Sequence, residues 1–117
     1  MSSVRELHDE AMRLAQLAQV ARHNGDEQQA DELARQAYQC EAQAAELVPT
    51  DEYTEPTRSI LYRSAASLAL QAREFDEAKR LISEGLSGNS PQQIEQEFAV
   101  LKEQVHIELL QAHEAER

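Results

Sequence analysis

The stretch AQLAQVARHNGDEQQADELARQA, residues 15–37, is the part of the sequence that decides the fold. Apolar and alanine side chains recur on both sides of its centre at steps of three or four residues, the spacing that places them on one face of an α-helix. At the centre, Asn24-Gly25-Asp26 interrupts this pattern. Glycine is favoured just beyond a helix end, and aspartate caps the start of the next helix. The stretch therefore predicts two antiparallel helices joined by a tight turn.

The same periodicity extends outward and accounts for nearly the whole chain. Pro49 ends the second helix, and an irregular segment leads to Pro56, which suits the first turn of a third. Ser90 and Pro91 then mark another helix start, with the serine as the capping residue. The predicted helices cover residues 3–23, 26–47, 56–72, 75–87 and 91–113. We therefore expect an all-α fold in a single domain, residues 1–117. It comprises hairpin one, hairpin two and a capping helix, at residues 3–47, 56–87 and 91–113.

The composition favours helices over a β-sheet. Apolar residues make up 41% of the sequence and aromatic residues only 4%, and there are three glycines and three prolines. A β-sandwich needs many more turn residues than this. Much of the apolar fraction is alanine, so we expect a thin core spread along the seams between helices. The alanines expected at close helix crossings are Ala18, Ala30, Ala66 and Ala78.

The net charge narrows the classes of partner. The chain carries 22 acidic and 11 basic residues, a formal charge of −11. Binding to a nucleic-acid backbone or to an anionic membrane depends on Lys and Arg. The excess of acidic residues therefore argues against both nucleic acid and membrane as partners. No apolar run approaches the length of a membrane-spanning helix, and the first residues are charged rather than apolar. With Cys40 as the single cysteine, the expected compartment is the cytoplasm.

The turns of the two hairpins can be aligned with each other. Residues 25–30 lie over residues 73–78, and small residues recur at matching places in the flanking helices. This arrangement resembles the tetratricopeptide repeat, whose two helices cross closely at small residues beside a turn that carries an aromatic residue. Phe75 matches that aromatic residue, and the matching small residues are Ala66, Ala78 and Gly85. The resemblance covers about residues 15–91.

The chain departs from that family in spacing. Its two turns are 48 residues apart, whereas the family repeats every 34 residues. Residues 4–47 also resemble the microtubule-interacting-and-transport domain, a three-helix bundle with similar alanine patterning, but this alternative explains less of the second half. The tetratricopeptide resemblance implies a non-catalytic interaction module or adaptor that binds a polypeptide partner in a helical groove. The last helix would then cover the open face of the second hairpin.

No group of residues forms a catalytic or metal-binding motif. The histidines do not form a zinc-protease pair, and Cys40, on or beside the apolar stripe of its helix, is expected to be an unreactive thiol. The carboxylates fall on polar helix faces, where a solvated surface accounts for them. We therefore expect no enzymatic activity, no cofactor and no metal; an enzyme with an unrecognised site is the least favoured alternative.

A basic segment contrasts with the acidic remainder of the chain. Residues 58–80 hold five basic and three acidic residues, whereas residues 1–57 hold four basic and twelve acidic residues. In tetratricopeptide proteins the first helix of each hairpin lines the binding groove. The resemblance therefore places Arg58, Tyr62 and Arg63 in that groove, and these residue types are enriched at interface hot spots.

These three residues are the predicted partner-binding site, for another protein or peptide with an acidic group or a terminal carboxylate. The start of a helix adds a positive dipole end that favours such a group. The alternative is that the arginines pair with nearby acids, such as Glu55 and Asp51.

The last predicted helix carries more apolar residues than one packed face needs. Leu101, Val105 and Leu109 define one stripe, and Ile107 and Leu110 lie off it. A second apolar stripe needs a contact of its own. Ile107 and Leu110 are therefore the predicted homodimer interface, and a structural homo-oligomer is the alternative function.

Overall fold

The computed structural model describes residues 2–115, a part of the chain that contains five α-helices and no strand. The helices are α1 (Val4–His23), α2 (Glu27–Glu46), α3 (Thr57–Gln71), α4 (Phe75–Leu86) and α5 (Gln92–Ala115), with a short 3-10 helix, η1 (Glu52–Thr54), between α2 and α3. The predicted all-α fold is confirmed, and each helix end falls within two residues of its predicted position. None of these helices is both long and apolar enough to span a membrane.

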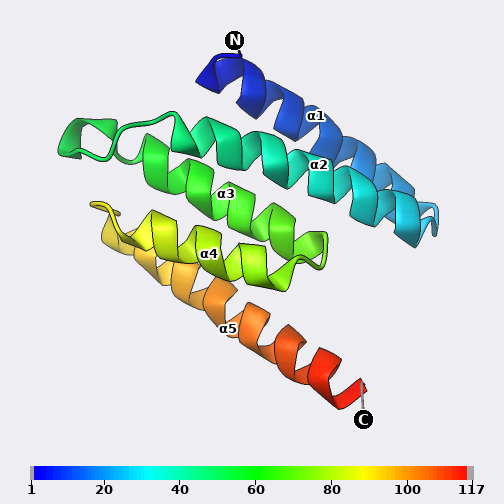
Figure 1. Ribbon diagram of the computed structural model, residues 1–117. Helices are drawn as coiled ribbons and strands as arrows, with labels where there is room; N and C mark the ends of the chain where they lie inside the picture. The colour runs from blue at the N-terminus through cyan, green and yellow to red at the C-terminus, as the bar shows by residue number, and fades with distance from the viewer. Residues whose placement is uncertain (1, 116–117) are drawn as a thin grey trace.

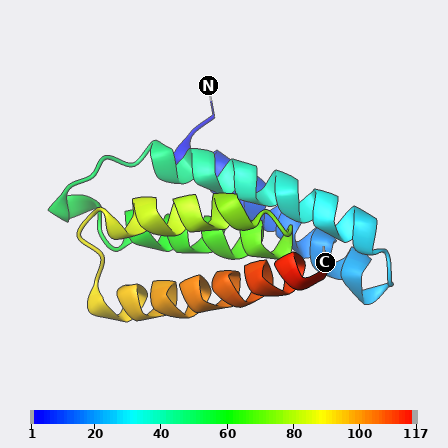
Figure 2. The ribbon, with the colours of Figure 1, turned by 60° about the horizontal axis from the view of Figure 1, so that its bottom comes forward.

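The helices pack in chain order as an open array of antiparallel neighbours (Figure 1). Each of α1 to α4 lies against the helix that follows it, and α5 also contacts α3. Figure 2 shows α5 along the edge of the array, beside α3 and α4. The array measures 45 × 29 × 21 Å. Because α5 is the last helix of the array, its outer side meets no further helix among the described residues.

Local sequence signals explain the first two helix starts. The Ser3 hydroxyl accepts the Glu6 backbone N–H, and the Glu6 carboxylate accepts the Ser3 N–H, which completes a capping box at α1. Before α2, Gly25 adopts φ 81°, in the left-handed region that favours glycine. Asp26 then caps α2 by accepting the Gln29 backbone N–H at 3.2 Å. The predicted tight turn is therefore confirmed.

Small residues allow the helices to approach closely. The alanines expected at helix crossings are at most 2% exposed: Ala18, Ala30, Ala66 and Ala78. Gly85 of α4 has no room for a side chain, because an added Cβ would lie 2.4 Å from Cζ of Phe98 and 3.0 Å from Cβ of Tyr62. The Phe98 ring is itself fully buried. Helices α3, α4 and α5 therefore converge around Gly85.

One carboxylate lies inside the core. Glu41 of α2 is fully buried, and Nδ1 of His8 on α1 lies 2.9 Å and 3.1 Å from its two carboxylate oxygens. The neighbouring Cys40 is only half-buried, so the acid rather than the thiol occupies the inner position. His8 supplies the partner that a buried carboxylate requires.

Candidate functional site

Arg58 and Tyr62, two of the three predicted partner-binding residues, are buried, at 3% and 4% exposure. The Arg58 guanidinium lies over the Tyr62 ring, with 4.8 Å between Cζ and the ring centroid. Burial raises the pKa of the Tyr62 phenol, and the charge of Arg58 opposes that shift. The expectation that both side chains are open to a partner is therefore wrong.

The C-terminal end of α4 explains why Arg58 is buried. The last carbonyl groups of a helix lack partners within the helix, and a cation is favoured beside them. Nη2 of Arg58 donates to the carbonyl oxygen of Glu84 at 3.0 Å, and the Ser90 hydroxyl donates to that of Gly85 at 3.0 Å. Ser90 therefore binds a carbonyl at the end of α4, whose cap residue is Ser87. Because α5 begins at Gln92, the residue just before it is Pro91, and the prediction that Ser90 caps this helix is wrong.

Close packing around the guanidinium also explains a glycine in the following loop. A Cβ added to Gly88 would lie 2.5 Å from Nη1 of Arg58 and 3.4 Å from Oε2 of Glu55. Oε1 of the same glutamate accepts the backbone N–H of Ser59 at 3.0 Å, near the start of α3. The α4–α5 loop thus closes over Arg58, which makes this arginine part of the scaffold.

Arg63 is the predicted binding residue that reaches the surface. Its guanidinium forms an ion pair with Glu97, which connects α3 to α5, and both side chains are partly exposed. The acids expected to pair with the arginines in the alternative interpretation, Glu55 and Asp51, form no ion pair with Arg58 or Arg63 among the described residues. A binding role for Arg63 stays a prediction.

Arg63 lines a groove of about 590 Å³ that runs over α1, α3 and α5. We call it the α1–α3–α5 groove. Its apolar lining includes Met12 of α1 and Val100 of α5, which are 37% and 70% exposed. The polar lining from α3 includes Ser64, Ser67 and Gln71. Three helices that are not consecutive in the chain thus present both apolar and polar side chains to one open surface.

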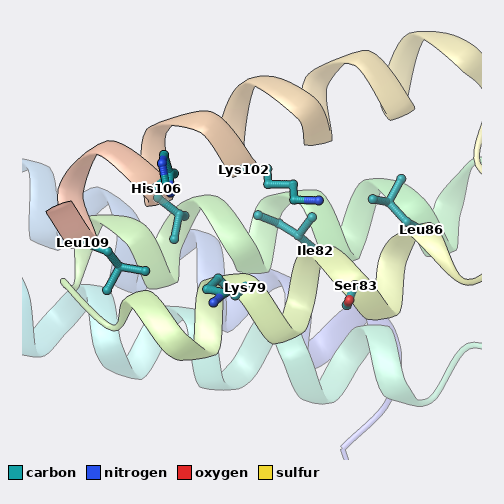
Figure 3. Close-up of a pocket in the computed structure, with 8 residues that line it drawn as sticks. Lys79, Ile82, Ser83, Leu86, Lys102, His106 and Leu109 are labelled. Atoms are coloured by element: carbon teal, nitrogen blue, oxygen red, sulfur yellow. The ribbon is translucent and has the colours of Figure 1, made fainter.

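A second, more enclosed groove of about 390 Å³ lies between α4 and α5 (Figure 3). We call it the α4–α5 groove. Its lining residues are Lys79, Ile82, Ser83 and Leu86 from α4, and Lys102, Val105, His106 and Leu109 from α5. Ile82 and Val105 are buried and form the apolar floor, whereas the two lysines and His106 are exposed. Lys79 and Lys102 are the only lysines in the sequence.

The α4–α5 groove was not predicted, although the sequence holds a signal for it. The same pattern occurs twice, from Lys79 to Leu86 and from Lys102 to Leu109. In each case a lysine is followed by an apolar residue three positions later and by a leucine seven positions later. Each spacing places the three residues on one helix face. Sequence alone does not show that two such faces meet, because their meeting depends on the packing of α4 against α5.

The predicted dimer residues lie on the surface of α5. Ile107 is 38% exposed and Leu110 is 53% exposed, whereas Val105 on the packed side of the same helix is 1% exposed. Their role in an interface stays a prediction.

Cys40 is the only thiol in the sequence. Burial, followed by the negative charges of Glu10 and Glu41, raises its pKa. Because the thiolate is the reactive form of cysteine, this environment makes Cys40 less reactive than a free thiol. No three or more His, Cys, Asp or Glu residues gather as a possible metal site within residues 2–115.

The fold and its surface define a small all-α protein of consecutively packed helices, whose surface includes the α1–α3–α5 groove and the α4–α5 groove. Comparison of the chain with protein-family models, with curated proteins and with solved structures found no match. The grooves and their residues are therefore the basis for assigning a function.

Proposed function

We propose that the chain is a non-catalytic protein–protein interaction module of tetratricopeptide-like type, which binds a segment of another polypeptide in the α1–α3–α5 groove. The observation that carries the proposal is that three helices alternating along the chain line this groove together. A segment bound there contacts both hairpins and the final helix rather than one helix alone. The proposed compartment is the cytoplasm.

The apolar lining supports a polypeptide as the ligand. Val100 of α5 has the most exposed apolar side chain in the groove, at 70%, and Met12 of α1 lines the same groove at 37% exposure. Exposed apolar side chains that gather in a groove rimmed by polar residues mark a surface for binding. Methionine adapts its shape to different partners because its side chain is unbranched and flexible. These features suit the side chains of a bound peptide.

Arg63 supports a polar contact at the same place. One of its terminal nitrogens donates to Glu97, and a guanidinium has five N–H donors in all. The remaining donors can bind a carboxylate or a backbone carbonyl of the partner without breaking the ion pair to Glu97. Arg63 is thus the part of the predicted Arg58, Tyr62 and Arg63 site that we retain.

Recovery of partners from the native host tests the proposal through two matched substitutions. Val100→Asp puts a charge in the groove, and Val20→Asp puts the same charge at an exposed position of α1 that does not line the groove. We expect a partner recovered with the wild type to be lost with Val100→Asp and kept with Val20→Asp, while both variants melt as the wild type does. Partners kept by Val100→Asp, or lost equally from both variants, would refute this site.

A second candidate function is a structural homo-oligomer, which the exposure of Ile107 and Leu110 favours. Both residues lie on the outer side of α5, where no further helix of residues 2–115 packs. Their burial between two copies would remove this apolar surface from water.

A further inference from the structure

The two halves of the α4–α5 groove have the same chemistry. On each helix a lysine is followed by a buried apolar residue three positions later and by a leucine seven positions later. Seven residues span about 10 Å along a helix, or two turns. Because α4 and α5 are antiparallel, the two sets of residues run in opposite directions, and Figure 3 shows Lys79 and Lys102 near the middle of the groove, with Leu86 and Leu109 toward its two ends.

The α4–α5 groove is lined by two lysines and by no acidic residue, on a chain that is acidic as a whole. Neither Lys79 nor Lys102 forms an ion pair with another residue within the described part of the chain. Five of the eight arginines in residues 2–115 hold at least one carboxylate, namely Arg13, Arg22, Arg35, Arg63 and Arg80, whereas Arg5, Arg58 and Arg73 hold none. No acidic residue lines the groove, although the chain has a formal charge of −11. An acidic ligand is thus repelled by most of the surface and attracted here.

The spacing of the lining residues favours a helix as the ligand of this groove. Two antiparallel helices that both present residues at steps of three, four and seven leave a furrow into which the ridge of a third helix can pack. Recognition of this kind depends on apolar anchors at the same steps on the bound helix.

We infer that the α4–α5 groove binds an acidic amphipathic helix of another polypeptide. Leucine-sized side chains on two turns of that helix would cover Ile82 and Val105, and its Asp or Glu residues would pair with Lys79 and Lys102. This site is separate from the α1–α3–α5 groove, so the two can be tested independently.

A designed pair of peptides tests the inference. Both have the same helical leucine face, and one carries glutamates on its flanks where the other carries lysines. Binding is measured by fluorescence anisotropy, and the site is mapped by amide chemical shifts. We expect the acidic peptide to bind and to lose affinity at high salt. Its binding should change the amide chemical shifts of residues 79–86 and 102–109. The lysine peptide should bind at least about tenfold more weakly, a difference of about 1.4 kcal/mol.

Variants separate the site from general effects of charge. The double substitution Lys79→Glu with Lys102→Glu should weaken binding of the acidic peptide by about tenfold or more. The control, Arg5→Glu with Arg13→Glu, makes the same charge change on α1 and should leave the affinity unchanged. The Val100→Asp variant should bind the acidic peptide as the wild type does, because Val100 does not line the α4–α5 groove. The two proposed sites can therefore be refuted separately.

Several results would overturn the inference. One is equal binding of the two peptides. Another is no binding of the acidic peptide up to about 1 mM, a concentration that corresponds to a binding free energy of about −4 kcal/mol. A third is chemical shift changes confined to residues outside the groove. A wild-type dimer that the lysine substitutions abolish would make a second copy the occupant. Binding of phosphatidylserine vesicles, lost on the same substitutions and without peptide binding, would make a membrane the occupant.

Discussion

At the scale of single residues, Arg58 and Arg63 lie five positions apart on α3 and have different roles. Arg58 is buried because its guanidinium reaches a carbonyl 26 residues away in the chain, at the end of α4. Arg63 stays at the surface because its partner, Glu97, is partly exposed on α5. The residue types indicated a positive surface, but neither of these distant partners can be read from the local sequence.

Arg58→Ala should lower the free energy of unfolding by about 2–3 kcal/mol, because it removes a hydrogen bond of a charged group and leaves a gap over Tyr62. Arg63→Ala is the matched control and should cost less than about 1 kcal/mol, because its ion pair is partly exposed to solvent. Urea unfolding of the two variants measures the difference. Equal losses would contradict the buried position of Arg58.

The Cys40 thiol should react with iodoacetamide more slowly than a free cysteine at every pH below its raised pKa. A raised pKa leaves a smaller thiolate fraction at a given pH, so the midpoint of the rate profile moves to higher pH. Alkylation rates measured from neutral to alkaline pH test this. The unfolded protein in urea is the control and should react as a free thiol does. A native profile that overlays the unfolded one would exclude this effect of burial.

At the scale of helices, the sequence predicted the helix ends and the small residues at the crossings, but not the burial of Arg58 and Tyr62 on α3. The ends follow local signals, such as Gly25 and the capping residue Asp26, which act within a few residues. On α3, Ala66 is buried as expected, but Arg58 and Tyr62, which were placed at a partner-binding surface, are buried as well. Helix α3 contacts α2, α4 and α5, so it is buried on more than one side. The periodicity of its apolar residues predicts one buried side and does not show that Arg58 is enclosed as well.

Gly85→Ala should destabilise the protein by about 1–3 kcal/mol through overpacking, despite the better helix propensity of alanine. The added Cβ meets the buried Phe98 ring and the Cβ of Tyr62, so neither neighbour can move aside into solvent. Thermal unfolding measures the loss. In a double-mutant cycle, Phe98→Leu should offset part of it, because the two substitutions change the same contact. Additive losses, or an unchanged melting temperature, would show that the helices do not converge there.

At the scale of the whole molecule, the number and order of the helices were predictable, because hairpins with short turns pack with their chain neighbours. The surface that the packing creates was not. Lys79 and Lys102 are 23 residues apart, and only the packing of α4 on α5 places them beside one apolar floor. In the same way, Met12 and Val100 line the α1–α3–α5 groove together although they are 88 residues apart in the chain.

Self-association is tested by light scattering of the chain at several concentrations. We expect the wild type to form at most a homodimer. Ile107→Glu with Leu110→Glu should give a folded monomer, because two charges replace apolar contacts on the outer side of α5. An unchanged helical circular dichroism spectrum would serve as the control for folding. A wild type that is already monomeric at high micromolar concentration would remove the structural homo-oligomer as a function.

The central claim is that another polypeptide occupies the α1–α3–α5 groove, and photo-crosslinking in the native host tests it most directly. A photoreactive amino acid replaces Ser67, which lines the groove on α3, or Gln39, an exposed residue of α2 outside it. The account predicts a discrete adduct with another protein from position 67, no such adduct from position 39, and loss of the adduct when Val100→Asp is added. Identical adducts from both positions, or adducts formed only between copies of this chain, would contradict it.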